Sequence, residues 1–159
     1  MENNKGDVVV MNSSNYSKFP AILKDKIKRG EIEFPLHTKF FYEPIRAYRM
    51  VERESEDFTK VSRKDFKSYA ELRKKKIRGK NIDTTKPEYY GVSLYRKQEM
   101  LENIMKLPKP NKKIARGFIY QEGGPQLTNE VTEHITWWLY EDVDLKEFEL
   151  LIEEGEKDE

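Results

Sequence analysis

The sequence predicts a single α+β domain with two or three helices and a mostly antiparallel sheet of five or six strands. The chain has 159 residues, which is the usual size of one domain. Its 9 Tyr, 8 Phe and 2 Trp provide enough large apolar side chains for one core. Strand-like segments gather in the C-terminal half instead of alternating with helices, which argues against a doubly wound parallel sheet.

The two ends of the chain differ from the middle in composition. Residues 1–19 are rich in Asn, Ser and Lys and are expected to form a flexible arm, with one short strand at residues 8–11. Residues 153–159 are acidic and are expected to be a disordered tail. The folded domain is therefore expected to span residues 20–152.

The first half of the domain carries one helix signal and one strand signal. A short helix is predicted between Pro20 and Gly30, because proline favours the first turn of a helix and glycine favours its end. Residues 45–51 are rich in β-branched and aromatic side chains and are predicted to form a strand.

A second helix is predicted to begin at Ser62. Ser62 and Asp65 have the spacing of a capping box, and Val61 and Phe66 have the spacing of a hydrophobic staple. This helix is expected to continue through a run of basic residues on the surface and to end before Gly79.

The C-terminal half alternates strand patterns with a single helix. Helical spacing of apolar residues predicts a helix around residues 100–105, which Pro108 and Pro110 end. The dipeptide Gly123-Gly124 followed by proline predicts a turn. Alternating apolar residues predict strands at residues 88–95, 113–120, 134–140 and 147–152.

A net charge of +1 conceals two oppositely charged segments. Residues 60–80 contain ten basic and two acidic residues, whereas residues 141–159 contain ten acidic and two basic ones. The basic helix is a candidate for binding the phosphate backbone of a nucleic acid. The alternatives are a solvated helix face and self-association through the acidic segment. The candidate binding residues are Arg73, Lys74, Lys75, Lys76 and Arg78.

Several classes of protein are disfavoured by missing residues and motifs. The chain has no cysteine, which excludes disulfides, thiolate nucleophiles and cysteine-ligated metals and fits a reducing compartment. Its two histidines lack the spacing of a metal site, and no phosphate-binding glycine loop is present. No apolar segment is long enough to cross a membrane. We therefore expect a cytoplasmic protein without a metal.

A few polar residues on the predicted strands could take part in chemistry. An arginine held on a strand, such as Arg49, can bind a diphosphate through its planar guanidinium. Tyr90 can stack on a flat heterocycle, and Ser93 follows it on the same predicted strand. Glu130 or Glu133 can stabilise positive charge developing at an anomeric carbon. His134 is more simply explained as a hydrogen-bonded edge or core residue.

This layout resembles the ADP-ribosyltransferase fold over residues 40–152. Members of that family place an Arg or His on the first core strand, a Ser or Tyr on the second and a Glu before a later one. The resemblance implies an NAD-binding cleft with Arg49 and Ser93 holding the cofactor and Glu130 or Glu133 as the catalytic carboxylate. The family's Ser-Thr-Ser triplet is absent from this chain.

Residues 137–141 offer a second type of surface. Trp137 and Trp138 are expected to face opposite sides of a strand, one in the core and the other partly exposed as a site for a ligand or partner. The stretch is also similar to one in small bacterial or phage proteins and implies no function. The sequence thus favours a non-enzymatic module that binds a protein or a nucleic acid, with an NAD-binding enzyme as the alternative.

Overall fold

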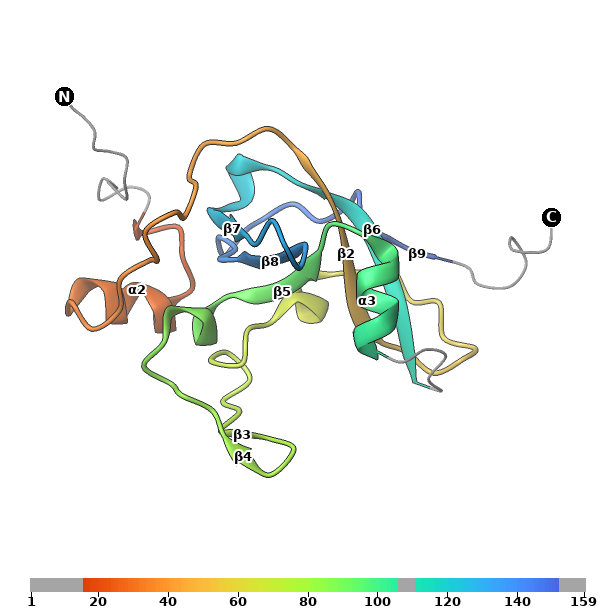
Figure 1. Ribbon diagram of the computed structural model, residues 1–159, viewed down its shortest axis with the longest axis horizontal. Coiled ribbons are helices and arrows are strands. Elements are labelled where there is room, and N and C mark those ends of the chain that lie inside the picture. Colours follow the sequence, from red (N-terminus) through yellow and green to blue (C-terminus); the bar gives the residue numbers. More distant parts are fainter. Residues whose placement is uncertain (1–15, 106–110, 152–159) are drawn as a thin grey trace.

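The computed structural model describes residues 16–105 and 111–151 and confirms the predicted α+β class. Six strands form one sheet in the order β7-β8-β5-β2-β6-β9, and every pairing in it is antiparallel (Figure 1). The strands are β2 (Ile45–Glu52), β5 (Val92–Tyr95), β6 (Lys112–Ile119), β7 (Gln126–Thr128), β8 (His134–Trp137) and β9 (Glu149–Leu150).

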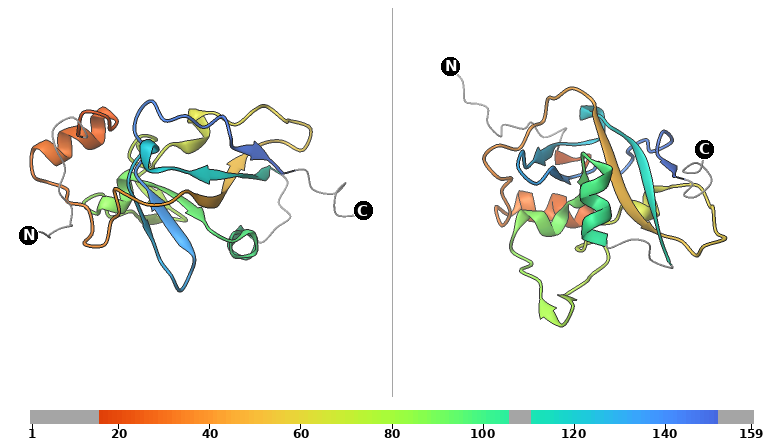
Figure 2. Two further views of the ribbon diagram at one scale, coloured as in Figure 1. Left: turned by 90° about the horizontal axis from the view of Figure 1, so that it is seen from above. Right: turned by 45° about the vertical axis from the view of Figure 1, so that its right-hand side comes forward.

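Within the described residues, two α-helices and three short 3-10 helices accompany the sheet. The helix α3 lies beside β2 and β5, whereas α2 lies at the opposite end of the molecule, beyond β7 (Figures 1 and 2). A separate two-stranded hairpin projects from the body. The bounds are α2 (Ala21–Lys28), α3 (Gln98–Met105), η1 (Arg63–Phe66), η2 (Pro87–Tyr90), η3 (Gln121–Gly123), β3 (Lys76–Ile77) and β4 (Lys80–Asn81).

The central pair β2–β6 has the longest register, from Ile45 opposite Ile119 to Glu52 opposite Lys112. Alternate residues of the sheet face two apolar clusters. On one face, Ala47 and Val51 of β2 pack with η1 and Phe148. On the other face, Leu101 and Met105 of α3 pack against Ile114 and half-buried tyrosines. Because side chains alternate along a strand, Arg49 is assigned to the first of these faces.

The predicted helix after Ser62 is wrong beyond its first turn. The capping box of Ser62 and Asp65 forms, but the 3-10 helix η1 ends at Phe66 and Lys67 is extended. Phe66, Ser68 and Ala70 are buried while their neighbours are more exposed, which is the period of an extended chain. Tertiary burial of alternate residues therefore overrides the local helix signal.

The expectation of an exposed indole is also wrong. Trp137 and Trp138 do belong to different apolar clusters, but both side chains are buried, at 1% and 0% exposure. Phe19, Leu23 and Phe34, from the segment that contains α2, cover Trp138. The sequence alone does not reveal this cover, because it comes from residues far from the tryptophan.

Most predicted strands form with shifted ends. The helical turn η2 replaces the first part of the strand predicted at residues 88–95, since Pro87 favours a helical first turn. The strand β8 ends at Trp137, and β9 has only two residues. Phe19, placed in the expected arm, is 2% exposed and belongs to the core. The expected strand at residues 8–11 and the acidic tail at residues 153–159 lie outside the described residues.

Candidate functional site

The hairpin β3–β4 stands away from the sheet and both helices (Figure 1 and right view of Figure 2). Its strands are joined by Arg78 and Gly79, whose φ angles are 51° and 80°. Positive φ at both central residues is the geometry of a type I′ turn, which matches the twist of two paired strands. Gly79 adopts this conformation without the steric cost that a side chain brings.

The base of the hairpin is held by one backbone hydrogen bond that continues its ladder and by one tyrosine hydroxyl from the body. The Ile82 amide donates to the Lys75 carbonyl at 2.8 Å, and the Tyr89 hydroxyl donates to the Lys74 carbonyl at 2.7 Å. Tyr89 belongs to the apolar cluster around Trp138, so the hairpin starts from an ordered base. The lysines make these contacts through their carbonyl groups, and both residues are exposed.

The hairpin and its base carry a dense positive charge. No acidic residue occurs between Leu72 and Asn81, and every basic side chain there is exposed. None of them forms an ion pair with a carboxylate in the described part of the chain. The six cations are Arg73, Lys74, Lys75, Lys76, Arg78 and Lys80.

An aromatic side chain borders this charge. Tyr69 is 40% exposed, and the Lys74 ammonium lies 5.6 Å from the centroid of its ring. Leu72, at 57% exposure, adds apolar surface at the base of the hairpin. Cations next to an accessible ring can contact both the phosphates and the bases of a nucleic acid.

Arg49 does not project into a cleft. Its guanidinium donates to the carbonyls of Asp65 at 2.9 Å and Ser93 at 2.8 Å, and it lies 5.3 Å from the centre of the Phe66 ring. Burial lowers the pKa of Arg49 to about 10, which leaves the group charged at neutral pH. The side chain therefore joins β2, β5 and η1 beneath the sheet.

Ser93 lies next to Arg49 through its backbone but contacts a different residue with its side chain. The Ser93 hydroxyl lies 2.9 Å from Nε2 of His134, which stands diagonally across from it on β8. The Tyr95 ring packs edge-on against the imidazole, and burial lowers the pKa of His134. His134 thus has the hydrogen bond that the sequence suggested, as a half-buried neutral residue.

The two candidate catalytic carboxylates are held by Arg96. Its guanidinium contacts Glu133 at 2.7 Å and Glu130 at 2.9 Å. Desolvation opposes the charge of Arg96, but the hydrogen bonds that it donates to Glu133 and Glu130 outweigh it and raise the pKa of the guanidinium. Both carboxylates are therefore engaged in ion pairs with Arg96. Neither is among the groups that Arg49 contacts.

Tyr90 is a core residue. Its ring is 7% exposed in the cluster with Trp138, and its hydroxyl donates to the Thr84 carbonyl. Of the residues assigned to an NAD site, the structure brings Arg49 next to Ser93 and, separately, Glu130 next to Glu133. The side chains of Arg49 and Ser93 lie on opposite faces of the sheet. No group of three or more residues able to hold a metal occurs in residues 16–105 and 111–151.

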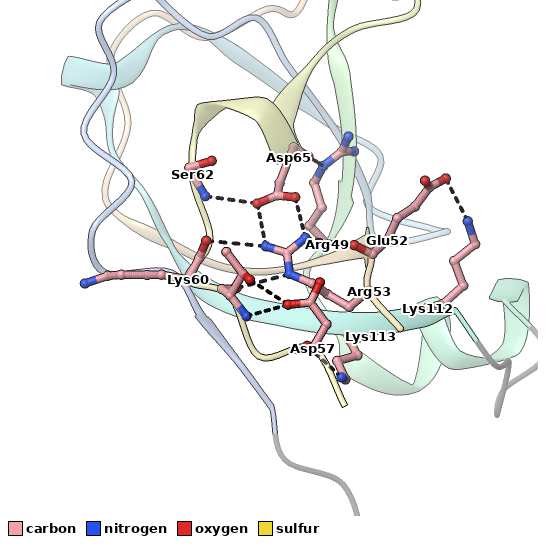
Figure 3. Close-up of polar contacts among 10 residues, drawn as sticks. Arg49, Glu52, Arg53, Asp57, Lys60, Ser62, Asp65, Lys112 and Lys113 are labelled. Atoms are coloured by element: carbon pink, nitrogen blue, oxygen red, sulfur yellow. Dashed lines mark hydrogen bonds and ion pairs between the residues drawn. The ribbon is translucent and has the colours of Figure 1, made fainter. Parts of the chain in front are cut away.

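The loop after β2 is held by two cations that the sequence did not single out, Arg53 at its start and Lys113 on β6. Arg53 donates five hydrogen bonds, two to the Asp65 carboxylate and three to the carbonyls of Glu52, Thr59 and Lys60 (Figure 3). Lys113 donates to three further carbonyls of the same loop, at 2.8–2.9 Å. Both use all the donors of their charged groups, so they are structural.

Comparison of the chain with protein-family models, with curated proteins and with solved structures finds no match. Within the described residues, no helix has the length and apolar character needed to cross a membrane. The candidate site therefore stands on its own geometry, which is a projecting, unpaired basic hairpin.

Proposed function

We propose that the protein is a non-enzymatic module that binds nucleic acid through the phosphate backbone. The observation that carries this proposal is the hairpin β3–β4 with its base, where six exposed cations have no described carboxylate partner. Such groups are already free to contact phosphates, and each contact releases counterions from the nucleic acid. A two-stranded ribbon also has the width that the major groove of a duplex admits.

The binding is expected to be largely independent of sequence. Asn81 is the one amide side chain in the hairpin and its base, against six lysines and arginines, so the contacts are expected to be mainly with phosphates. Tyr69 and Leu72 can add contacts to sugars or unstacked bases at the edge of the hairpin. Strong salt dependence is the expected signature.

Fluorescence anisotropy with a labelled mixed-sequence duplex tests this proposal. Replacing Lys74, Lys75 and Lys76 together by glutamine should lower the affinity and reduce the salt slope by about 1 for each lost phosphate contact. A matched variant replaces Lys24, Lys28 and Arg29 of the α2 region by glutamine, with the same change in charge. It should bind the duplex almost as well as the unmodified protein.

An equal loss of duplex affinity in the two triple variants would mean that net charge alone drives the binding. The hairpin would then not be the binding site. Absence of binding to duplex and single strands would instead favour a protein partner. The NAD-binding alternative stays a prediction from the resemblance, and titration with NAD, with Arg49→Ala as the variant, tests it separately.

A further inference from the structure

A cleft of about 690 Å³ lies beside β6 and β9, apart from the residues of the hairpin. Its walls come from β2, from the loop after β2, from β6 and from the segment that leads into β9. Its volume lies within the range of roughly 300–1,000 Å³ that small-molecule sites occupy. The cations and exposed rings that matter for binding are Arg46, Phe58, Lys60, Arg116 and Phe118.

The cleft exists because β9 pairs with only part of β6. The register joins Ala115 with Leu150 and Arg116 with Glu149, and it ends there. At the next position, Gly117, an added Cβ would lie 2.7 Å from the Phe148 ring. Glycine therefore lets the buried Phe148 side chain pack directly under β6.

The opposite wall is held rigidly. The loop that carries Phe58 and Lys60 is fixed by the hydrogen bonds of Arg53 and Lys113 (Figure 3). The Lys60 carbonyl accepts a hydrogen bond from Arg53, and Lys60 is one of the residues that line the cleft. A preformed wall reduces the ordering cost of binding a ligand.

Three cations of the cleft have no carboxylate partner. Arg46, Lys60 and Arg116 form no ion pair with any carboxylate in residues 16–105 and 111–151. Two acidic residues also line the cleft, both on the β9 side, and one of them, Glu147, accepts a hydrogen bond from the Tyr120 hydroxyl at 2.6 Å. The lining thus has an excess of positive charge, with its carboxylates confined to one wall.

Two exposed aromatic rings accompany these cations. Phe118 is 36% exposed, and the Arg46 guanidinium lies 4.8 Å from the centre of its ring. Phe58 is 60% exposed, and the Lys113 ammonium lies 4.1 Å from the centre of its ring. A flat ring or guanidinium beside free cations is the combination that binds a base and its phosphate together.

From this combination we infer that the cleft binds a nucleoside phosphate. The base stacks on Phe118 or on the guanidinium above it, and the phosphate contacts Arg46, Arg116 or Lys60. The nucleoside phosphate can be a free nucleotide or one unit of a single strand, since both present the same base and phosphate. This inference does not rest on the hairpin, which shares no residue with the cleft.

Calorimetric titration with AMP, with a short single-stranded oligonucleotide and with inorganic phosphate tests the inference. Phe118→Ala and Arg46→Gln should each weaken nucleotide binding by roughly tenfold, the scale of one lost stacking or charged contact. The matched controls are Phe41→Ala, which removes an 81% exposed ring elsewhere, and Arg29→Gln, which removes an arginine outside the cleft. Neither control should change the affinity.

The results separate the two sources and can overturn the inference. If AMP binds and both cleft variants weaken its affinity, the site is assigned to free nucleotides. If the variants weaken only the affinity for the oligonucleotide, the site is assigned to a single strand. Nucleotide binding that neither cleft variant changes, or inorganic phosphate that binds as tightly as AMP, would overturn the inference. The triple hairpin variant is measured alongside, because its duplex affinity reports the proposed function independently of the cleft.

Discussion

Cations contact the loop after β2 and also line the hairpin β3–β4, but their side chains differ in whether they are bonded to the protein. Arg53 is 8% exposed and directs every donor of its guanidinium to protein oxygens. In the hairpin, Lys75, Lys76 and Arg78 are exposed and have no ion-pair partner in the described part of the chain. A cation whose donors are all used supports the fold, whereas a cation without partners is free for a ligand.

The two regions also differ in what determines their shape. The loop is held by charged side chains that contact backbone carbonyls, as Figure 3 shows for Arg53 and Lys113. The hairpin is held by its turn, by a backbone hydrogen bond at its base and by the Tyr89 hydroxyl, and its cations form no ion pair with a described carboxylate. Loss of a cation should therefore destabilise the loop but leave the fold of the hairpin intact.

The largest expected effect is that of Arg53→Met. The change leaves the Asp65 carboxylate without its partner at a site where its side chain is 12% exposed. Breaking a buried ion pair in this way typically lowers the free energy of unfolding by about 3–5 kcal/mol. Urea denaturation measures the effect, and Arg29→Met, at a 59% exposed side chain, should change stability by less than about 0.5 kcal/mol. Similar stability of the two variants would contradict the structural role of Arg53.

The ion pair between Arg53 and Asp65 also predicts that the stability of the fold depends on pH. Burial opposes the charge of Asp65, but the hydrogen bonds from Arg53 and the Ser62 amide outweigh it, so the pKa of Asp65 lies below its usual value. The resulting stabilisation is complete above the unfolded pKa of about 3.9 and is lost as the pH falls through the lower folded value. Urea midpoints measured between neutral and acid pH should therefore fall less steeply in Asp65→Asn than in the unmodified protein. Parallel curves for the two proteins would contradict this assignment.

A smaller effect on stability is expected from Gly79→Val. A side chain at a φ of 80° costs about 1–2 kcal/mol, and the strain falls on the projecting hairpin. We expect weaker duplex binding with little change in the urea midpoint of the domain. Gly30→Val is the matched control, because Gly30 has a φ of 71° and equally open surroundings at the end of α2. Equal duplex affinities of the two variants would show that the shape of the hairpin is unimportant.

Much of the fold follows from local patterns. Pro20 and Gly30 bracket α2, and helical spacing locates α3, because both signals act within a few residues. The strand β2 is predicted to within one residue from its aromatic and β-branched side chains. The capping box of Ser62 and Asp65 was correct as a contact and wrong as the start of a long helix. Its interpretation failed because burial of Phe66 and Ala70 is decided by distant residues.

The candidate site, too, can be predicted only in part from the sequence. The charge of residues 73–80 is visible in the sequence, but their arrangement as a hairpin instead of a helix is not. The cleft beside β9 had no local signal, since its walls come from four separate segments. Arg46 and Phe118 are 72 positions apart in the numbering and meet only through the β2–β6 register.

The sequence by itself determined the α+β class, the two helices and the segregation of charge, because these depend on composition and on short-range periodicity. Tertiary structure decided which cations bond to protein carbonyls and carboxylates and which have no ion-pair partner among the described residues. Arg49 and Arg53 reach carbonyls and a carboxylate because η1 packs against the sheet, whereas the hairpin cations form no ion pair with any described carboxylate. The physical reason is that hydrogen bonds and ion pairs act over a few ångströms, so their partners are set by the folded chain and not by proximity in sequence.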